Sequence, residues 1–300
     1  MRSKLSARLR KGAWLYIMFL PTLIFVFLFN YLPLLGIRFA FYRYNVFSPP
    51  RFVGFANFER LFESPRFWSV FKNTIEISLI NLVLGMAAAV LVALLLNEIG
   101  RMYLKRPIQT IIYLPHFMSW VVTASIFQLI LAPQTGLVNN FLVGTGIIKT
   151  PIYFLANETW WRPAFFFITR WRETGWGTII YLAALTGINP ELYESAAIDG
   201  AGKLKQALFI TIPCIAPTII IVLILQLSRV LNIFEPILVL YNPVVYSVAD
   251  VIQTYNYRVG LLESDYGFST AVGLFRSLIC MILVLGANYI SKRVRGRGIL

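Results

Sequence analysis

Long apolar stretches alternate with short charged segments along almost the whole chain. The clearest stretch, 108–131, has 24 residues without an Asp, Glu, Lys or Arg. About 20 helical apolar residues are enough to cross the hydrocarbon core of a bilayer. The pattern therefore predicts an all-α integral membrane protein, in which 1–300 form a single transmembrane domain with six transmembrane helices. The predicted spans are 14–35, 71–96, 108–131, 163–185, 212–231 and 268–290.

Composition and charge agree with this class. Hydrophobic residues make up 58% of the chain and charged residues 13%, which is far from the balance of a soluble domain. The net charge of +14 comes from segments that fall on one side if the spans alternate, and the positive-inside rule makes that side cytoplasmic. We therefore expect both termini in the cytoplasm, with anionic membrane lipid rather than nucleic acid as partner. The basic residues are Arg2, Lys4, Arg8, Arg10, Lys11, Arg101, Lys105, Arg106, Lys203, Lys205, Lys292, Arg293, Arg295 and Arg297.

The first apolar run has no signal for cleavage, and the two cysteines have no spacing typical of metal ligands. The run follows basic residues, as in a signal peptide, but it is too long and has no small-residue cleavage site, so we expect an uncleaved first span. Cys214 and Cys280 lie in or beside apolar segments without metal-ligand spacing. We expect them to be free buried thiols.

One polar segment, 191–213, interrupts the apolar second half of the chain. Pro190 is suited to start a helix there, and Glu191 and Glu194 would lie near its positive N-terminal end. Gly200 supplies a sharp exit, because glycine adopts backbone angles that other residues resist. We predict a short helix and turn that fit a groove on another protein, the alternative being an ordinary amphipathic connector.

The spacing in this segment resembles the EAA loop of the membrane subunits of bacterial ABC importers. The matching positions are Glu194, the alanine pair 196–197, the run 199–201 and the segment 210–213, with nine residues between Gly200 and Ile210. Ser195 stands in place of the first alanine of the triplet. Further segments are similar to LplB-type carbohydrate permeases, relatives of the maltose permease subunits without their large external insertion. These segments are 115–120, 175–185, 241–246, 250–255 and 271–275.

The resemblance implies a type I ABC importer permease fold with a cytoplasmic coupling helix, in a bacterial cytoplasmic membrane. It implies a second permease subunit in a heterodimer, two ATPase subunits, an extracytoplasmic solute-binding protein and an oligosaccharide substrate. This chain has no GxxxxGK[ST] loop, so ATP and Mg²⁺ would bind to the ATPase subunits and this chain would carry no cofactor. The residues expected to couple to the ATPase are Glu194, Ala197, Asp199, Gly200 and Ala201.

Arginines inside predicted spans need an explanation, because each costs about 2.5–3.5 kcal/mol on insertion scales. Individually they could pair or reach the headgroups: Arg170 with Glu173, and Arg229 with Glu235 or Asn232. As a set, in the outer halves of three consecutive spans, they favour a water-filled cavity lined by bases. The arginines of the set are Arg170, Arg172, Arg229 and Arg276.

Residues two apart on a helix point about 200° apart, so Arg170 and Arg172 cannot both face such a cavity. We predict that Arg172 faces it, because Trp176 lies one turn further on, and that Arg170 pairs with Glu173. Aromatic planes suit the apolar faces of sugar rings, and arginines bind carboxylates bidentately. The predicted substrate is therefore an acidic, uronate-containing oligosaccharide, with neutral oligosaccharides or another small solute as alternatives. The predicted pathway residues are Arg172, Trp176, Arg276, Arg229, Trp171 and Tyr181.

The remaining polar and aromatic residues favour structural roles. We expect a hydrogen-bonded His116 beside a proline kink, Glu76 at a helix interface, and Trp160 and Trp161 as anchors at the membrane surface. Aromatic residues in 55–62 indicate a small interfacial helix in an external connection. A membrane enzyme acting on lipid or glycan is the competing class, but the chain offers no acid/base or metal constellation for one. We therefore predict no catalytic and no metal-binding residues.

Overall fold

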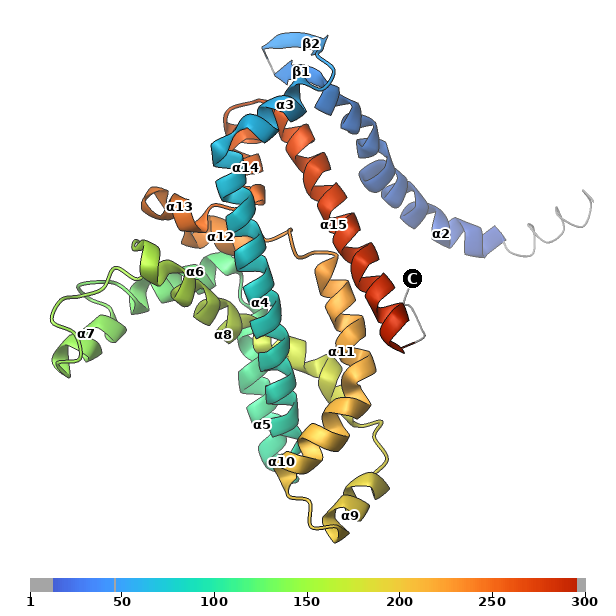
Figure 1. The fold of residues 1–300 in the computed structure, drawn as a ribbon, viewed down its shortest axis with the longest axis vertical. Helices are drawn as coiled ribbons and strands as arrows, with labels where there is room; N and C mark the ends of the chain where they lie inside the picture. The colour runs from blue at the N-terminus through green and yellow to red at the C-terminus, as the bar shows by residue number, and fades with distance from the viewer. Residues whose placement is uncertain (1–12, 46, 296–300) are drawn as a thin grey trace, which may run out of the picture. The chain divides into compact units, whose positions relative to one another are not determined.

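The computed structural model describes residues 13–45 and 47–295, and Figure 1 traces their order. Two compact units are formed by Met1–Glu63 with Asn256–Phe275, and by Ser64–Tyr255 with Arg276–Leu300. We refer to them as the first and second units. The predicted orientation of the two termini, and the basic residues in 1–12 and 296–300, lie outside the described residues.

The first unit joins an apolar helical segment to a small hairpin. Ala13–Phe41 is continuous and apolar, which confirms a helix over the predicted span 14–35. Asn57 then fixes α3 against the chain, because its amide donates to the carbonyl oxygens of Ala40 and Tyr42 at 2.8 and 3.0 Å. A helix over 55–62 was expected and is present, whereas the hairpin was not predicted. The elements are α2 (Ala13–Val26), η1 (Phe27–Tyr31), η2 (Leu32–Phe41), β1 (Tyr42–Asn45), β2 (Ser48–Phe52), α3 (Ala56–Glu63) and η6 (Arg258–Leu262).

The second unit is built around α4 and α8, with shorter helices beside them. α14 (Ile252–Tyr257) and α15 (Tyr266–Arg295) each run from one unit into the other. The other elements of the unit are α4 (Pro65–Asn97), α5 (Met102–Tyr113), η3 (Leu114–Phe117), α6 (Trp120–Ile130), α7 (Leu137–Gly144), α8 (Glu158–Leu185), α9 (Glu191–Ile198), α10 (Lys203–Gln206), η4 (Ala207–Thr211), α11 (Ile212–Leu227), α12 (Glu235–Leu240), η5 (Pro243–Val245) and α13 (Tyr246–Ala249).

Four helical segments among the described residues are long and apolar enough to cross a membrane: Ala13–Phe41, Pro65–Asn97, Lys203–Leu227 and Tyr266–Tyr289. They coincide with four of the predicted spans. A fifth is obtained if α5 and α6 together count as one span. α8 also covers the predicted span 163–185, but it carries three charged residues between 170 and 173, so it is less apolar than the other four.

The predicted span 108–131 is sharply bent, at the proline where a kink was expected. α5 with η3 and α6 meet at an angle of 102°. Pro115 has no N–H group to continue the helical hydrogen bonds. Ser119 then starts a new helix, because its hydroxyl oxygen accepts from the N–H of Val122 at 3.2 Å. The long uncharged stretch therefore holds a sharp bend.

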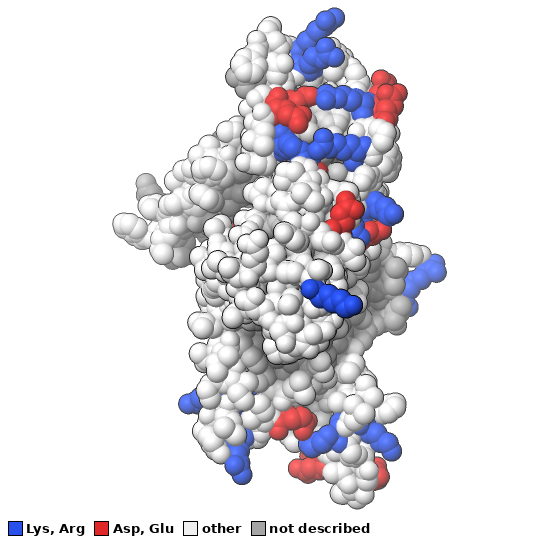
Figure 2. Space-filling view, turned by 90° about the vertical axis from the view of Figure 1, so that its left-hand side faces the viewer, with Lys and Arg blue, Asp and Glu red and all other residues white. Residues whose placement is uncertain are grey.

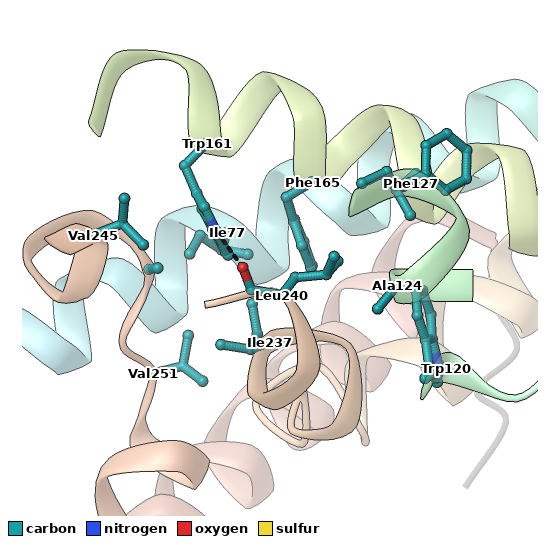
Figure 3. Packing of buried hydrophobic residues seen from close by; sticks show 12 residues of the cluster. Ile77, Trp120, Ala124, Phe127, Trp161, Phe165, Ile237, Leu240, Val245 and Val251 are labelled. Carbon is teal, nitrogen blue, oxygen red and sulfur yellow. Dashed lines mark hydrogen bonds between the residues drawn. The ribbon is translucent and has the colours of Figure 1, made fainter. Parts of the chain in front are cut away.

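One apolar cluster of the second unit packs α4, α6 and α8 against the segment 237–251 (Figure 3). Trp161 is fully buried there, stacks on Phe165 at 5.1 Å, and donates its indole N–H to the carbonyl oxygen of Leu240 at 3.1 Å. The expectation that Trp161 anchors at the membrane surface is therefore wrong, because its whole ring is enclosed. Its neighbour Trp160 remains 42% exposed.

Next to this cluster, Arg162 ties α8 to α4 and α13. Its guanidinium contacts Glu76 Oε2 at 2.7 Å and Asn73 Oδ1 at 2.8 Å, while its Nε donates to the carbonyl oxygen of Val248 at 3.0 Å. Glu76 thus lies at a helix interface, as predicted. Both cysteines are free, but Cys214 is exposed in this subunit, so the prediction of a buried thiol is wrong there.

Candidate functional site

A cavity of about 640 Å³ opens between α4, α8 and α11. This volume lies within the range of small-molecule sites, about 300–1,000 Å³. Polar groups from all three helices reach its wall, together with two aromatic side chains from α8. The polar and aromatic lining residues are Ser78, Asn81, Arg170, Glu173, Trp176, Tyr181, Gln226, Ser228, Arg229 and Asn232.

Arg170 extends from α8 across the cavity wall to α4. Its Nη2 donates to Asn81 Oδ1 at 2.6 Å, and the guanidinium lies directly against Gly85, where a side chain would collide with it. The absence of a side chain at Gly85 therefore leaves the space that the guanidinium of Arg170 occupies. The buried Nε of Arg170 has no hydrogen-bond partner among the described residues, so part of the binding capacity of the arginine is unused.

Arg172 does not line the cavity, contrary to the prediction. Its Nε and Nη2 donate to the carbonyl oxygen of Met118 at 3.0 and 2.7 Å, its Nη1 pairs with Glu173, and its guanidinium lies 4.5 Å from the ring of Trp120. Met118 is extended after η3, so its carbonyl group is free for a side-chain donor. The bend at 114–119 thus provides partners for Arg172. The two arginines exchange their expected places, since Arg170 faces the cavity and Arg172 pairs with Glu173.

Glu173 links the cavity wall to the bend. Its Oε2 lies 2.9 Å from Nδ1 of His116, and the imidazole stacks on Trp176 with ring centroids 4.6 Å apart and planes 6° apart. The predicted hydrogen-bonded histidine beside a proline is confirmed. Both carboxylate oxygens of Glu173 are therefore engaged, one by Arg172 and the other by His116.

The other predicted pathway residues divide into two groups. Arg229 and Tyr181 line the cavity, and Arg229 makes no ion pair among the described residues. Trp171 instead packs edge-on against Phe127 at 5.2 Å, and Arg276 lies partly buried on α15 outside the cavity wall. Trp171 and Arg276, both predicted as pathway residues, therefore do not line this cavity.

Sequence reasoning missed the uncharged polar residues of the cavity. Ser78 and Asn81 lie on α4, and Gln226 lies at the end of α11. Ser78 Oγ and the Tyr181 hydroxyl are buried without a hydrogen-bond partner among the described residues. These residues could have been noticed as polar side chains inside otherwise apolar spans. The sequence argument considered only the charged and aromatic residues of the spans.

The segment 191–201 forms the helix and turn that its sequence predicts. α9 begins after Pro190, has Glu191 and Glu194 in its first turn, and ends before Gly200, whose φ is +75°. The N–H of Ala201 closes the turn on the carbonyl oxygen of Ala196 at 2.8 Å. Positive φ at this turn explains the glycine.

α9 and the turn are exposed in this subunit. Ile198 is 87% exposed, and none of the residues of α9 is buried. Figure 2 shows charged side chains gathered at the end of the second unit that carries α9 and α10, below a broad surface of uncharged side chains.

Apolar helices, a polar cavity between them and an exposed helix at one end define a membrane component of a transport system. The chain belongs to the family of binding-protein-dependent transport system inner membrane components, whose model matches residues 81–296.

Relatives match along nearly the whole chain. Protein LplB of Bacillus subtilis (strain 168) is 39% identical over 98% of this chain and 93% of its own length. The polygalacturonan/rhamnogalacturonan transport system permease protein YteP of the same organism is 41% identical over 99% of this chain and 94% of its own length.

A solved structure is also similar over nearly all residues. It is the crystal structure of a bacterial ABC transporter involved in the import of the acidic polysaccharide alginate, and one of its chains matches with a TM-score of 0.89 and 40% identity. The match covers 97% of this chain and 99% of that chain. A second crystal structure, of a bacterial alginate ABC transporter in complex with alginate pentasaccharide-bound periplasmic protein, matches with a TM-score of 0.89 and 39% identity over 99% of this chain and 100% of that chain.

Proposed function

We propose that this chain is the permease subunit of an ATP-driven importer of oligosaccharides and that its cavity favours acidic, uronate-containing ones. The relatives named for polygalacturonan/rhamnogalacturonan transport and for alginate import support the substrate class. The main structural support for the proposal is the positive charge of the cavity wall. Arg170 and Arg229 face the cavity without an ion-pair partner among the described residues, whereas Glu173 is already engaged.

A solute carboxylate is the natural partner for these two guanidinium groups. A hydrogen bond to a charged group contributes about 1.5–3 kcal/mol, and arginine binds carboxylates with two parallel bonds. The surrounding helices lower the local dielectric constant, so the interaction is stronger than at an open surface. Trp176 adds an aromatic plane on the same wall, suited to the apolar face of a sugar ring. The cavity thus combines charge selection with ring recognition.

The proposal includes a motor outside this chain. α9 would fit a cleft of an ATPase subunit through Glu194, Ala197, Asp199, Gly200 and Ala201. ATP and Mg²⁺ would bind to two such subunits. A second permease subunit would complete the pathway, and a solute-binding protein would deliver the oligosaccharide. We further propose six spans with α8 as one of them, α5 and α6 together forming another, and both termini in the cytoplasm.

ATP hydrolysis by the complete assembly tests this function. The chain is co-purified with its partner permease, ATPase and solute-binding protein, and hydrolysis is measured with tetragalacturonate and with a neutral oligosaccharide of equal length. We expect tetragalacturonate to stimulate hydrolysis more strongly. Equal stimulation by both sugars would support the importer function but contradict selection by charge. Stimulation by neither sugar would contradict the proposal that the substrate is an oligosaccharide.

A further inference from the structure

Trp176 offers a half-exposed indole to the cavity, and one of its faces is already covered. The side chain lines the cavity and is 48% exposed. His116 stacks flat on the ring at 4.6 Å, and Phe117 meets it edge-on at 6.1 Å and 83°. Both covering residues belong to the bend between α5 and α6. The opposite face of the indole is therefore the one available to a solute.

The orientation of His116 is itself fixed by its hydrogen bond. Nδ1 lies 2.9 Å from Oε2 of Glu173, whose other oxygen pairs with Arg172. Arg172 in turn donates twice to the carbonyl oxygen of Met118, two residues after the histidine. These contacts run from the bend to α8 and back, so they restrict rotation of the imidazole about its side-chain bonds. Because the imidazole of His116 is held in one orientation and stacks on Trp176, it also holds the indole in one plane.

We propose that His116 is a positioning residue that holds the indole of Trp176 in the plane that receives a sugar ring. The inference rests on the proposed function, because it requires the cavity to be a solute pathway. A ring that is already held loses less conformational freedom when a solute stacks on it, which favours binding. The hydrogen bond to Glu173 and the stack on Trp176 have separate tasks, since the bond orients the imidazole and the stack transmits that orientation.

Two substitutions separate the stack from the hydrogen bond. His116→Gln keeps a side chain able to donate to Glu173 but removes the ring, whereas His116→Phe keeps a flat ring without the bond. Binding of radiolabelled tetragalacturonate is measured on the purified membrane assembly with the solute-binding protein omitted. We expect His116→Gln to weaken binding about two- to tenfold, the effect of one immobilised side chain. His116→Phe keeps the stack but loses the bond that orients the ring, so it should weaken binding less than His116→Gln does.

A double-mutant cycle shows whether His116 acts through Trp176. In a Trp176→Leu background, His116→Gln should cause no further loss, because the ring that it positions is gone. An equal loss in both backgrounds would overturn the inference by showing a general structural effect. If the glutamine variant fails to assemble, His116→Asn is measured in both backgrounds and judged by the same outcomes.

The same cycle distinguishes failure of the inference from failure of the proposed function. If Trp176→Leu weakens binding but His116→Gln does not, the positioning role is wrong and the cavity remains a sugar site. If neither substitution changes binding, the positioning role is overturned and the cavity also loses its proposed role as a sugar site.

Discussion

Arg170 and Arg172 lie two residues apart on α8 and meet different surroundings. Arg170 reaches Asn81 and the cavity, whereas Arg172 is held by Met118 and Glu173 at the bend. Helical spacing alone established that only one of them faces a given side. It could not decide which, because the choice depends on a carbonyl group that becomes available only where the chain bends.

Arg170→Gln is expected to lower uptake of an acidic oligosaccharide far more than uptake of a neutral one. Losing one charged hydrogen-bond donor costs about 1.5–3 kcal/mol, or roughly ten- to a hundredfold in binding. Initial uptake rates into proteoliposomes that contain the complete assembly measure the effect. Arg101→Gln is the control, because Arg101 is exposed before α5 and outside the cavity wall, so the same chemical change there should affect both sugars equally. An equal effect of Arg170→Gln on both sugars would contradict the role of Arg170.

Gly85→Ala should disturb Arg170 without removing its charge. The added methyl group would collide with the guanidinium, which must move and lose its short bond to Asn81. We expect acidic uptake to fall severalfold while neutral uptake changes little. Gly286→Ala on α15 is the control, because a methyl group there meets no atom within 4 Å. Identical behaviour of the two alanine variants would show that the Gly85 contact has no influence on selection.

Among the helices and strands, those determined by residues close together in the sequence were predicted best. The short helix α9 follows from Pro190, two early glutamates and Gly200, all within eleven residues, and its bounds were predicted well. The kink at Pro115 was predicted but its size was not, because the bend at 114–119 also depends on Ser119 starting a new helix inside the same apolar run. The hairpin of β1 and β2 was not predicted, because β2 contains Pro49 and Pro50 and adjacent prolines are typical of loops rather than strands.

The turn after α9 gives a prediction about coupling. Gly200→Ala places a side chain at φ +75°, which costs about 1–2 kcal/mol, so the turn should open and α9 should dock poorly. Gly202→Ala is the control, because Gly202 has a φ of −68° that alanine adopts freely. With equal amounts of protein in the membrane, only Gly200→Ala should reduce uptake and sugar-stimulated ATP hydrolysis. Normal activity of Gly200→Ala would argue against the coupling assignment.

At the scale of the whole molecule, the alternation of spans predicts opposite sides for two exposed sites. Phe47 lies at the turn of the hairpin and Ile198 at the end of α9, and their side chains are 88% and 87% exposed. In a chain without Cys214 and Cys280, we expect Phe47→Cys to react with an impermeant thiol reagent added outside intact cells. Ile198→Cys should react only after the membrane is opened. Labelling of Ile198→Cys from outside would reverse the topology.

The charge of the cavity is proposed to make this subunit select acidic oligosaccharides. The most direct measurement is ATP-driven uptake of tetragalacturonate and a neutral tetrasaccharide into proteoliposomes, comparing the unmodified assembly with one that carries Arg170→Gln and Arg229→Gln together. Selection by charge predicts a strong preference for tetragalacturonate that the double substitution abolishes, with neutral uptake retained. A preference that persists in the double variant, or the absence of a preference in the unmodified assembly, would contradict it.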